Sequence, residues 1–287
     1  MKPIVKYQGG KSRELPLIKT LLPQNYDTVL EPFAGGAAVS FALGHRCILN
    51  DMNDALINMY QQVSNPQTFQ DVFSHVAHLK TLEHDDLSDE FYKARDYING
   101  TERDPYTWAV SYITVRQLCF SGMERYNKDG KFNVPFGHYK RFSCNLDWNH
   151  MKFLHQSGSS IYHGDFEPIF DMATEDDFIF IDPPYLDRLG YAHGNDTLHE
   201  RLVNCMHKTK AKWLFIHTKH DFYMDTLWEY NIMFRPYGYS QRFGKDRDHS
   251  GAQVEHMYVT NYEDEMTLHR VSNSSLQNII DRGRIGA

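Results

Sequence analysis

The sequence predicts a doubly wound α/β fold that is interrupted by one inserted subdomain. Short apolar runs alternate with helical patterns, and a long gap separates the second run from the third. The run over 178–181 is continuously apolar, which is typical of a central parallel strand buried on both faces. The gap, over 66–158, is far too long for a single crossover and therefore predicts an insertion.

The predicted strands are short apolar runs bounded by turn residues. Two of them precede the gap and five follow it, and we expect the last two to pair antiparallel. In chain order they cover residues 27–30, 47–50, 160–162, 178–181, 212–217, 231–235 and 255–261.

Spaced apolar residues predict a helix over 54–63, after the second strand, and two helices inside the insertion, over 91–98 and 108–118. The segment Asn127-Lys128-Asp129-Gly130-Lys131 predicts a hairpin turn, because Asp-Gly suits positions with positive φ. The insertion is therefore expected to be helical with a basic β-hairpin.

The chain has 287 residues, of which 41% are hydrophobic and 23% charged, as is ordinary for a globular protein with a core. A formal charge of −7 does not favour nucleic-acid binding, but the charges are unevenly distributed. Residues 116–141 are locally basic, although a solvated loop is the commoner meaning of such a segment. Its basic residues are Arg116, Arg125, Lys128, Lys131, Lys140 and Arg141, and its acidic residues are Glu124 and Asp129.

The four cysteines are scattered without a Cys-x-x-Cys pair, so we expect neither a zinc site nor a disulfide framework. No apolar run approaches the ~20 residues that span a bilayer, and the first residues lack the apolar core of a signal peptide. A cytoplasmic protein is expected.

A glycine-containing turn, Glu31-Pro32-Phe33-Ala34-Gly35-Gly36, follows the first strand. Its glycines let a ligand approach the backbone, and the next helix offers free N–H groups, but the dinucleotide pattern G-x-G-x-x-G is absent. Asp51, at the end of the second strand, is placed to hold both ribose hydroxyls of a nucleoside. The alternative is a structural turn beside a surface carboxylate.

The segment Asp182-Pro183-Pro184-Tyr185 directly follows the strand over 178–181, at the end where ligands bind in such sheets. The prolines leave acceptor carbonyls, so the turn offers a carboxylate, carbonyls and an aromatic face. This set suits a planar group that bears NH₂, and it suits phosphate poorly. The alternative is a rigid turn with a packing tyrosine.

Three further segments are weak signals taken singly. Tyr7-Gln8-Gly9-Gly10-Lys11 lacks the full spacing of a phosphate loop, which argues against an NTPase. Gly164-Asp165-Phe166 follows the third strand, where Asp165 is most simply a helix N-cap. The group of His217, His220 and Asp221 has no evident third ligand, and we interpret it as a strand end followed by a helix cap.

Taken in order, these motifs resemble those of the Dam-type (D12 class, alpha group) adenine-N6 DNA methyltransferases. The likeness runs over about residues 3–262 and includes the segments 120–127, 131–137 and 259–262. It implies a Rossmann-like S-adenosylmethionine-dependent methyltransferase sheet with an inserted helical plus β-hairpin DNA-recognition subdomain. The implied parts are a catalytic S-adenosylmethionine-binding domain over 1–65 and 159–262, a target-recognition subdomain over 66–158, and a C-terminal tail over 263–287.

The resemblance implies S-adenosylmethionine as the cofactor. Asp51 would hold its ribose, and Asp165 and Phe166 would hold its adenine. The residues implied to bind it are Tyr7, Lys11, Phe33, Ala34, Gly35, Gly36, Asp51, Asp165, Phe166 and Asp182.

The implied reaction transfers a methyl group directly to N6 of an adenine that is flipped out of duplex DNA. Tyr185 would stack on this base, while the Asp182 carboxylate and the Pro183 carbonyl would accept the N6 hydrogens. Pro184 completes the set of catalytic residues. Neither a metal nor a covalent intermediate is implied.

The hairpin is implied to enter the major groove of duplex DNA. Arg125 would read a guanine, Phe120 would act as an aromatic wedge, and the lysines would mainly meet phosphates. Ser121 and His138 stand where the Dam pattern has Asn and Arg, so GATC is not predicted as the site. The residues implied to bind DNA are Phe120, Ser121, Arg125, Asn133, Pro135, His138, Lys128, Lys131, Lys140 and Arg141.

The sequence thus predicts a site-specific adenine DNA methyltransferase of the EC 2.1.1.72 type. It would act in a bacterial or phage-infected host cell, phage-borne or in a restriction-modification system. Two alternatives stay open: a catalytically silent DNA-binding regulator, and a methyltransferase that acts on RNA or a protein amide. The basic hairpin, and Asp182 in place of Asn, favour double-stranded DNA.

Overall fold

All seven strands expected from the sequence are present in the computed structural model. The chain forms two compact units, Met1–Leu15 with Thr28–Ile169, and Pro16–Asp27 with the described residues from Phe170 onward. The tail predicted over 263–287 lies outside the described residues except for Glu263. The structure describes residues 1–156, 158–186, 196–238 and 253–263.

Three parallel strands form the sheet of the first unit, with β2 (Cys47–Asp51) between β1 (Val29–Glu31) and β3 (Ser160–His163). Leu49 of β2 lies opposite the last residue of β1 and opposite Ile161 of β3. Because the strands are parallel, their carboxyl ends lie at one edge, where ligands bind in sheets of this kind.

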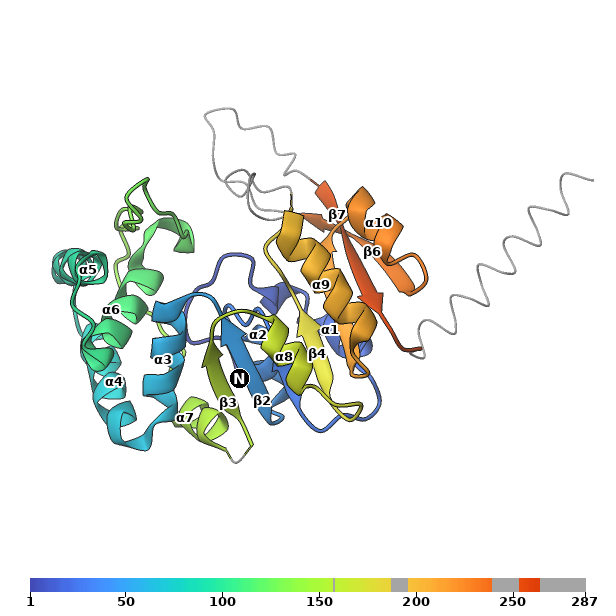
Figure 1. Cartoon of the computed structure of the whole chain (residues 1–287). Helices are drawn as coiled ribbons and strands as arrows, with labels where there is room; N and C mark the ends of the chain where they lie inside the picture. Colours follow the sequence, from blue (N-terminus) through green and yellow to red (C-terminus); the bar gives the residue numbers. More distant parts are fainter. Residues whose placement is uncertain (157, 187–195, 239–252, 264–287) are drawn as a thin grey trace, which may run out of the picture. The chain divides into compact units, whose positions relative to one another are not determined.

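The connection from β2 to β3 is largely helical, as predicted. The first unit holds η1 (Lys11–Arg13), α2 (Ala38–Leu43), α3 (Asp54–Ser64), α4 (Pro66–Leu79), α5 (His84–Asn99), α6 (Pro105–Leu118), η2 (Phe120–Gly122) and α7 (Trp148–His155). Helices α3, α4 and α5 all pack against α6, and they stand together beside the strands of this unit (Figure 1). Every residue of α6 from Ala109 to Leu118 is buried, so its apolar side chains are not confined to one face.

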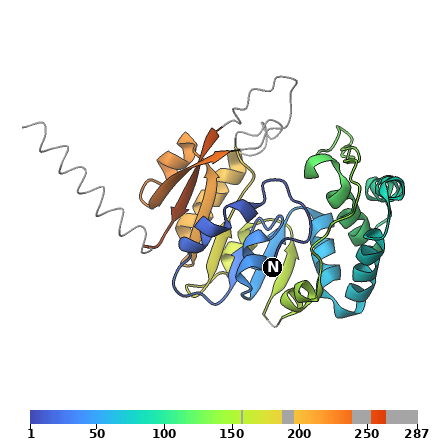
Figure 2. The same ribbon diagram turned by 180° about the vertical axis from the view of Figure 1, so that it is seen from behind.

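The second unit combines parallel and antiparallel strands. Strand β4 (Phe178–Ile181) is parallel to β5 (Lys212–Thr218), and β7 (Gln253–Thr260) is antiparallel to both β5 and β6 (Asn231–Gly238). The expected final antiparallel pair is thus confirmed, and it is coloured orange and red in Figure 2. The helices α9 (Asp196–Lys208) and α10 (Asp221–Thr226) also belong to this unit, and α1 (Leu15–Thr20) and α8 (Glu167–Met172) begin at its borders.

The alternation of strands and helices confirms the α/β class. All four residues of β4 are buried, as its continuous apolar run predicts. Helices α1, α4, α7 and α9 are not predicted from the sequence, and the predicted helix over 91–98 is the second half of the longer α5. Among the described residues, no helix has the length and apolar character needed to cross a membrane.

Candidate active site and nucleic-acid interface

Asn50 of β2 joins two loops at the carboxyl edge of the first unit's sheet. Its side chain is buried, and its Nδ2 donates to the carbonyls of Pro32 and Gly164, each at 3.0 Å. The Asn50 carbonyl in turn accepts from the N–H of Ala34 at 2.8 Å. One side chain therefore fixes the turns that follow β1 and β3 beside the end of β2. Sequence reasoning missed Asn50, although a polar residue inside a buried strand is itself a signal.

Asp51, the last residue of β2, is held by two backbone donors. Its Oδ2 accepts from the N–H of Gly35 at 2.8 Å, and its Oδ1 accepts from the N–H of Asn53 at 2.9 Å. Burial raises the pKa of Asp51, while these two hydrogen bonds oppose the rise. A carboxylate offers about four lone-pair sites, so Asp51 has the capacity to accept further hydrogen bonds.

The ring of Tyr7 covers the glycine turn after β1. A Cβ atom at Gly35 would lie 2.8 Å from Cε1 of Tyr7, and Gly35 has a φ of +47°, so only glycine fits there. The Tyr60 hydroxyl donates to the Gly35 carbonyl at 2.8 Å. Burial, followed by the nearby charge of Asp51, raises the pKa of Tyr7 well above its usual value, so its phenol stays neutral. We call Tyr7, Gly35, Asn50, Asp51 and Phe166 the edge cluster.

Phe33, Lys11 and Asp165 are further predicted cofactor residues of this unit. The rings of Phe33 and Phe166 lie 5.1 Å apart, and Phe166 is buried. The Lys11 side chain is also buried, and its Nζ donates to the Gly9 carbonyl at 3.0 Å. Asp165 is exposed and accepts from the N–H of Glu167, so it caps α8 as the sequence suggests.

In the second unit, residues 182–185 form the DPPY turn directly after β4. The Pro183 and Tyr185 side chains are buried, whereas Pro184 is exposed and Asp182 is partly exposed. The ring of Tyr185 lies 4.7 Å from that of His217 and 5.7 Å from that of His256. The tyrosine is therefore packed between aromatic neighbours, as the structural alternative expects. Residues 187–190, which follow the turn, lie outside the described residues.

His217 of β5 packs against the DPPY turn. Its Nδ1–H donates to the Thr218 carbonyl at 2.6 Å, so its Nε2 accepts from the N–H of Leu186 at 3.2 Å. Burial lowers the pKa of His217 to about 3, which keeps the imidazole neutral in this role. The predicted strand end and helix cap are confirmed, because His220 caps α10 by accepting from the N–H of Phe222. No group of three metal-ligating side chains occurs in the part of the chain that the structure describes.

The predicted turn closes a basic hairpin over residues 119–137, which isolated bridges pair at Cys119–Phe136 and Tyr126–Phe132. Asn127 Oδ1 accepts from the N–H groups of Asp129 and Lys131, and Gly130 has a φ of +72°. Along the returning arm, exposed and buried residues alternate. The exposed residues are Lys131, Asn133 and Pro135, and the buried residues are Phe132, Val134 and Phe136.

The predicted DNA contacts of this hairpin are exposed. Arg125 Nε donates to Asn133 Oδ1 at 2.7 Å, which holds the guanidinium against the returning arm. The Phe120 side chain is 40% exposed, and both Ser121 and His138 have a φ of +54°. Lys128, Lys140 and Arg141 are exposed as well.

Arg116 does not contribute to the exposed positive charge of residues 116–141. Its side chain is 1% exposed and pairs with Glu124, with Nη1 3.3 Å from Oε2. It is therefore an internal cation rather than part of a basic surface. The surface charge of the segment comes from the remaining basic residues.

The sequence model for the D12 class N6 adenine-specific DNA methyltransferases matches residues 7–234 of this chain. The type II methyltransferase M.CviBI of Paramecium bursaria Chlorella virus NC1A is 32% identical over 279 residues, which cover 91% of this chain and 100% of the relative. The DNA adenine methylase of Haemophilus influenzae is 31% identical over 64% of each chain. The DNA N-6-adenine-methyltransferase of Escherichia phage P1 is 35% identical over 64% of this chain and 24% of its own length. The matched residues include the edge cluster, the basic hairpin and the DPPY turn.

Proposed function

This chain belongs to the family of D12 class N6 adenine-specific DNA methyltransferases. We propose which of its residues bind the cofactor, hold the adenine and contact the DNA. The protein is an N6-adenine DNA methyltransferase, and its mostly parallel α/β architecture is consistent with a Rossmann-like methyltransferase fold. The family implies S-adenosylmethionine as the methyl donor.

The edge cluster fits the nucleoside end of this cofactor. The ribose presents two hydroxyl donors, and Asp51 presents two carboxylate oxygens that are already oriented by Gly35 and Asn53. The close approach of Tyr7 to Gly35 leaves no room for a side chain at that turn. When bound, S-adenosylmethionine supplies an electrophilic methyl group on its sulfonium. The protein's part is to hold the donor in a fixed place, which supplies much of the rate.

The DPPY turn is proposed to hold the adenine. The N6 atom is inaccessible inside a duplex, so the base must leave the stack, which costs a few kcal/mol. The Asp182 carboxylate and the Pro183 carbonyl would accept the two N6 hydrogens, and this raises the lone-pair density on the nitrogen. Tyr185, braced by His217, would supply the aromatic face for the base. N6 loses a proton on methylation, and the Asp182 carboxylate would accept it.

The basic hairpin is proposed as the reader of double-stranded DNA. Arg125 carries a planar donor pair that suits a guanine edge, and such a contact is worth ~1–3 kcal/mol of discrimination. Lys128 and Lys131 lie at the exposed turn, where they would meet phosphates and add affinity without sequence information. Phe120, 40% exposed at the base of the hairpin, supplies the wedge.

The observation that carries this assignment is the pair of backbone donors that aim Asp51 at the open edge of the sheet. The test is long-read modification mapping of DNA from a methylation-free host that expresses the protein. We expect N6-methyladenine in one short motif, as in a type II modification enzyme. Unmodified DNA from cells that contain soluble protein would overturn the proposal in favour of a silent DNA-binding regulator or a substrate other than DNA.

A further inference from the structure

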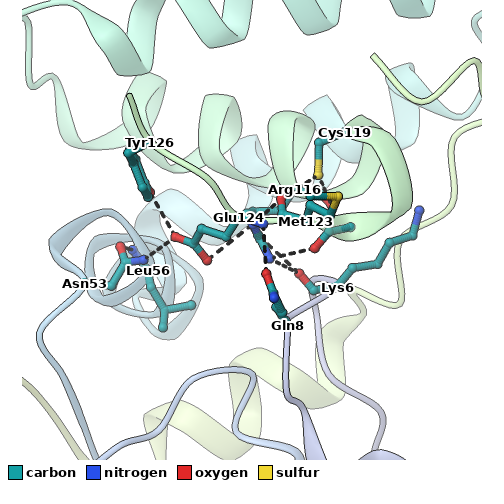
Figure 3. Close-up of polar contacts among 10 residues, drawn as sticks. Lys6, Gln8, Asn53, Leu56, Arg116, Cys119, Met123, Glu124 and Tyr126 are labelled. Atoms are coloured by element: carbon teal, nitrogen blue, oxygen red, sulfur yellow. Dashed lines mark hydrogen bonds and ion pairs between the residues drawn. The ribbon is translucent and has the colours of Figure 1, made fainter. Parts of the chain in front are cut away.

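Glu124 lies at the base of the basic hairpin and joins it to the rest of the first unit. Its Oε1 accepts from Asn53 Nδ2 at 3.1 Å and from the Tyr126 hydroxyl at 2.9 Å, and its Oε2 lies 3.3 Å from Arg116 Nη1 (Figure 3). Its own N–H donates to Gln8 Oε1 at 3.2 Å. A single carboxylate thus contacts the hairpin, the start of α3 and the end of α6.

Asn53 links this carboxylate to the edge cluster. Its N–H donates to Asp51 Oδ1 at 2.9 Å, its Oδ1 accepts from Leu56 N–H at 3.0 Å as the N-cap of α3, and its Nδ2 donates to Glu124. The path from Gly35 through Asp51 and Asn53 to Glu124 is therefore an unbroken series of hydrogen bonds. The two middle residues of the path are held by regular structure, because Asp51 ends β2 and Asn53 caps α3.

Arg116 makes the Glu124 end of this path rigid. Its guanidinium donates to the carbonyls of Lys6, Gly122 and Met123 at 2.9–3.2 Å, and the side chain is almost fully buried. A buried guanidinium needs a partner of opposite charge, because leaving it alone costs several kcal/mol. Glu124 is that partner, so the carboxylate cannot leave Asn53 without weakening the ion pair.

The path ends at the residues proposed to read DNA. Arg125 follows Glu124 directly, and its side chain is tied to Asn133, another of these residues, across the hairpin. The Asn133 N–H also donates to the Arg125 carbonyl at 3.0 Å. A displacement of Glu124 therefore moves the arm that carries Arg125.

We propose that Glu124 and Asn53 are positioning residues that couple cofactor occupancy of the edge cluster to ordering of the basic hairpin. The inference rests on the proposed cofactor role of Asp51. A nucleoside bound to Asp51 favours the arrangement in which Asn53 and Glu124 are in contact, and that contact fixes the arm of Arg125. The coupling is reciprocal, so an ordered hairpin strengthens cofactor binding by the same factor.

The experiment measures amide hydrogen exchange of residues 124–134 with and without S-adenosylhomocysteine, which has the same nucleoside end as the cofactor. The variant is Asn53→Ser, because serine keeps an N-cap acceptor for α3 and the backbone donor to Asp51 but cannot reach Glu124. Removing Glu124 itself would leave Arg116 buried without a counter-ion. The matched control is Asn65→Ser, since Asn65 is an exposed asparagine that caps α4 through Gln67 N–H.

In the wild type and in Asn65→Ser, we expect the ligand to slow exchange of the hairpin amides by about fivefold or more. In Asn53→Ser, we expect calorimetry to show that the ligand still binds, while the hairpin amides exchange at the rate of the free protein. Equal slowing in Asn53→Ser and the wild type, or ligand binding to the wild type without slowing, would overturn the coupling alone. A wild type that does not bind S-adenosylhomocysteine would overturn the cofactor role of the edge cluster, and the coupling with it.

Discussion

The imidazole of His217 lies 4.7 Å from the ring of Tyr185, and its Nε2 accepts a hydrogen bond from the N–H of Leu186, the residue after Tyr185. The proposed base-binding tyrosine is thus held by a histidine that must stay neutral. Protonation of Nε2 would remove the acceptor and place a charge among buried aromatic rings. The packing of His217 against the DPPY turn therefore depends on pH.

Stability should therefore fall as the pH is lowered. The pKa of His217 is lowered from 6.5 to about 3 in the folded chain, so only the unfolded chain takes up this proton in the range between those values. The contribution of neutral His217 to the free energy of unfolding is fully present above pH 6.5. It falls by about 1.4 kcal/mol for each pH unit as the pH is lowered toward 3. In urea unfolding, the free energy of unfolding should fall between pH 7 and pH 5 by about 2 kcal/mol less in His217→Gln than in the wild type. The exposed His155→Gln should keep the full dependence.

Asp182→Ala should lower single-turnover methyl transfer by about 10³-fold, because one oriented acceptor for the reacting nitrogen is lost. Binding to duplex DNA, measured by fluorescence anisotropy, should be largely retained, since the proposed DNA contacts other than those to the flipped adenine lie on the basic hairpin. Asp225→Ala, which removes an exposed carboxylate from α10 of the same unit, is the control and should transfer at the normal rate. Undiminished transfer in Asp182→Ala would refute the assigned role.

Arg125→Ala should relax the sequence preference at one base pair, at a cost of ~1–3 kcal/mol for the preferred site. Lys128→Ala should instead weaken binding to all sequences and reduce the slope of log K against log salt by about 1. Competition binding against duplexes with single base changes, at several salt concentrations, separates the two effects. An Arg125 variant that loses affinity uniformly would reassign that residue to a phosphate.

Gly35→Ala should weaken S-adenosylhomocysteine binding by about tenfold, which corresponds to ~1.4 kcal/mol. The added methyl group would meet Tyr7 at 2.8 Å and displace the ring that covers the turn. Gly44→Ala is the matched control, because Gly44 has a φ of +72° and no atom within 4 Å of an added Cβ. Both variants should lose about 1–2 kcal/mol of unfolding free energy from the left-handed backbone, but only Gly35→Ala should lose ligand affinity in calorimetry.

Much of the fold was predictable because its signals are local. The continuous apolar run of β4 and the helix cap at Asp165 both appear in the structure where the sequence places them. Asp51 stands at the end of β2, as expected from the length of the preceding run. The hairpin turn follows from Asp129-Gly130, whose preferred dihedral angles it uses.

The internal polar network was not predictable in the same way. A local count of charge does not distinguish Arg116 and Glu124 from solvated residues, because nothing local shows that all sides of α6 are covered. The burial of Arg116 depends on contacts with Lys6, over a hundred residues earlier in the chain. Asn50 likewise acts through carbonyls that only the folded sheet brings together. Such residues are defined by tertiary neighbours rather than by spacing.

The alternation along the returning arm of the hairpin bears on how such an enzyme can change its target over evolutionary time. Phe132, Val134 and Phe136 anchor the arm in the core, while Lys131, Asn133 and Pro135 face outward. Substitutions at exposed positions usually change stability by less than about 0.5 kcal/mol. On the proposed DNA-reading role of this hairpin, substitutions on the outward face would change the recognition sequence while the buried inward face preserves the fold.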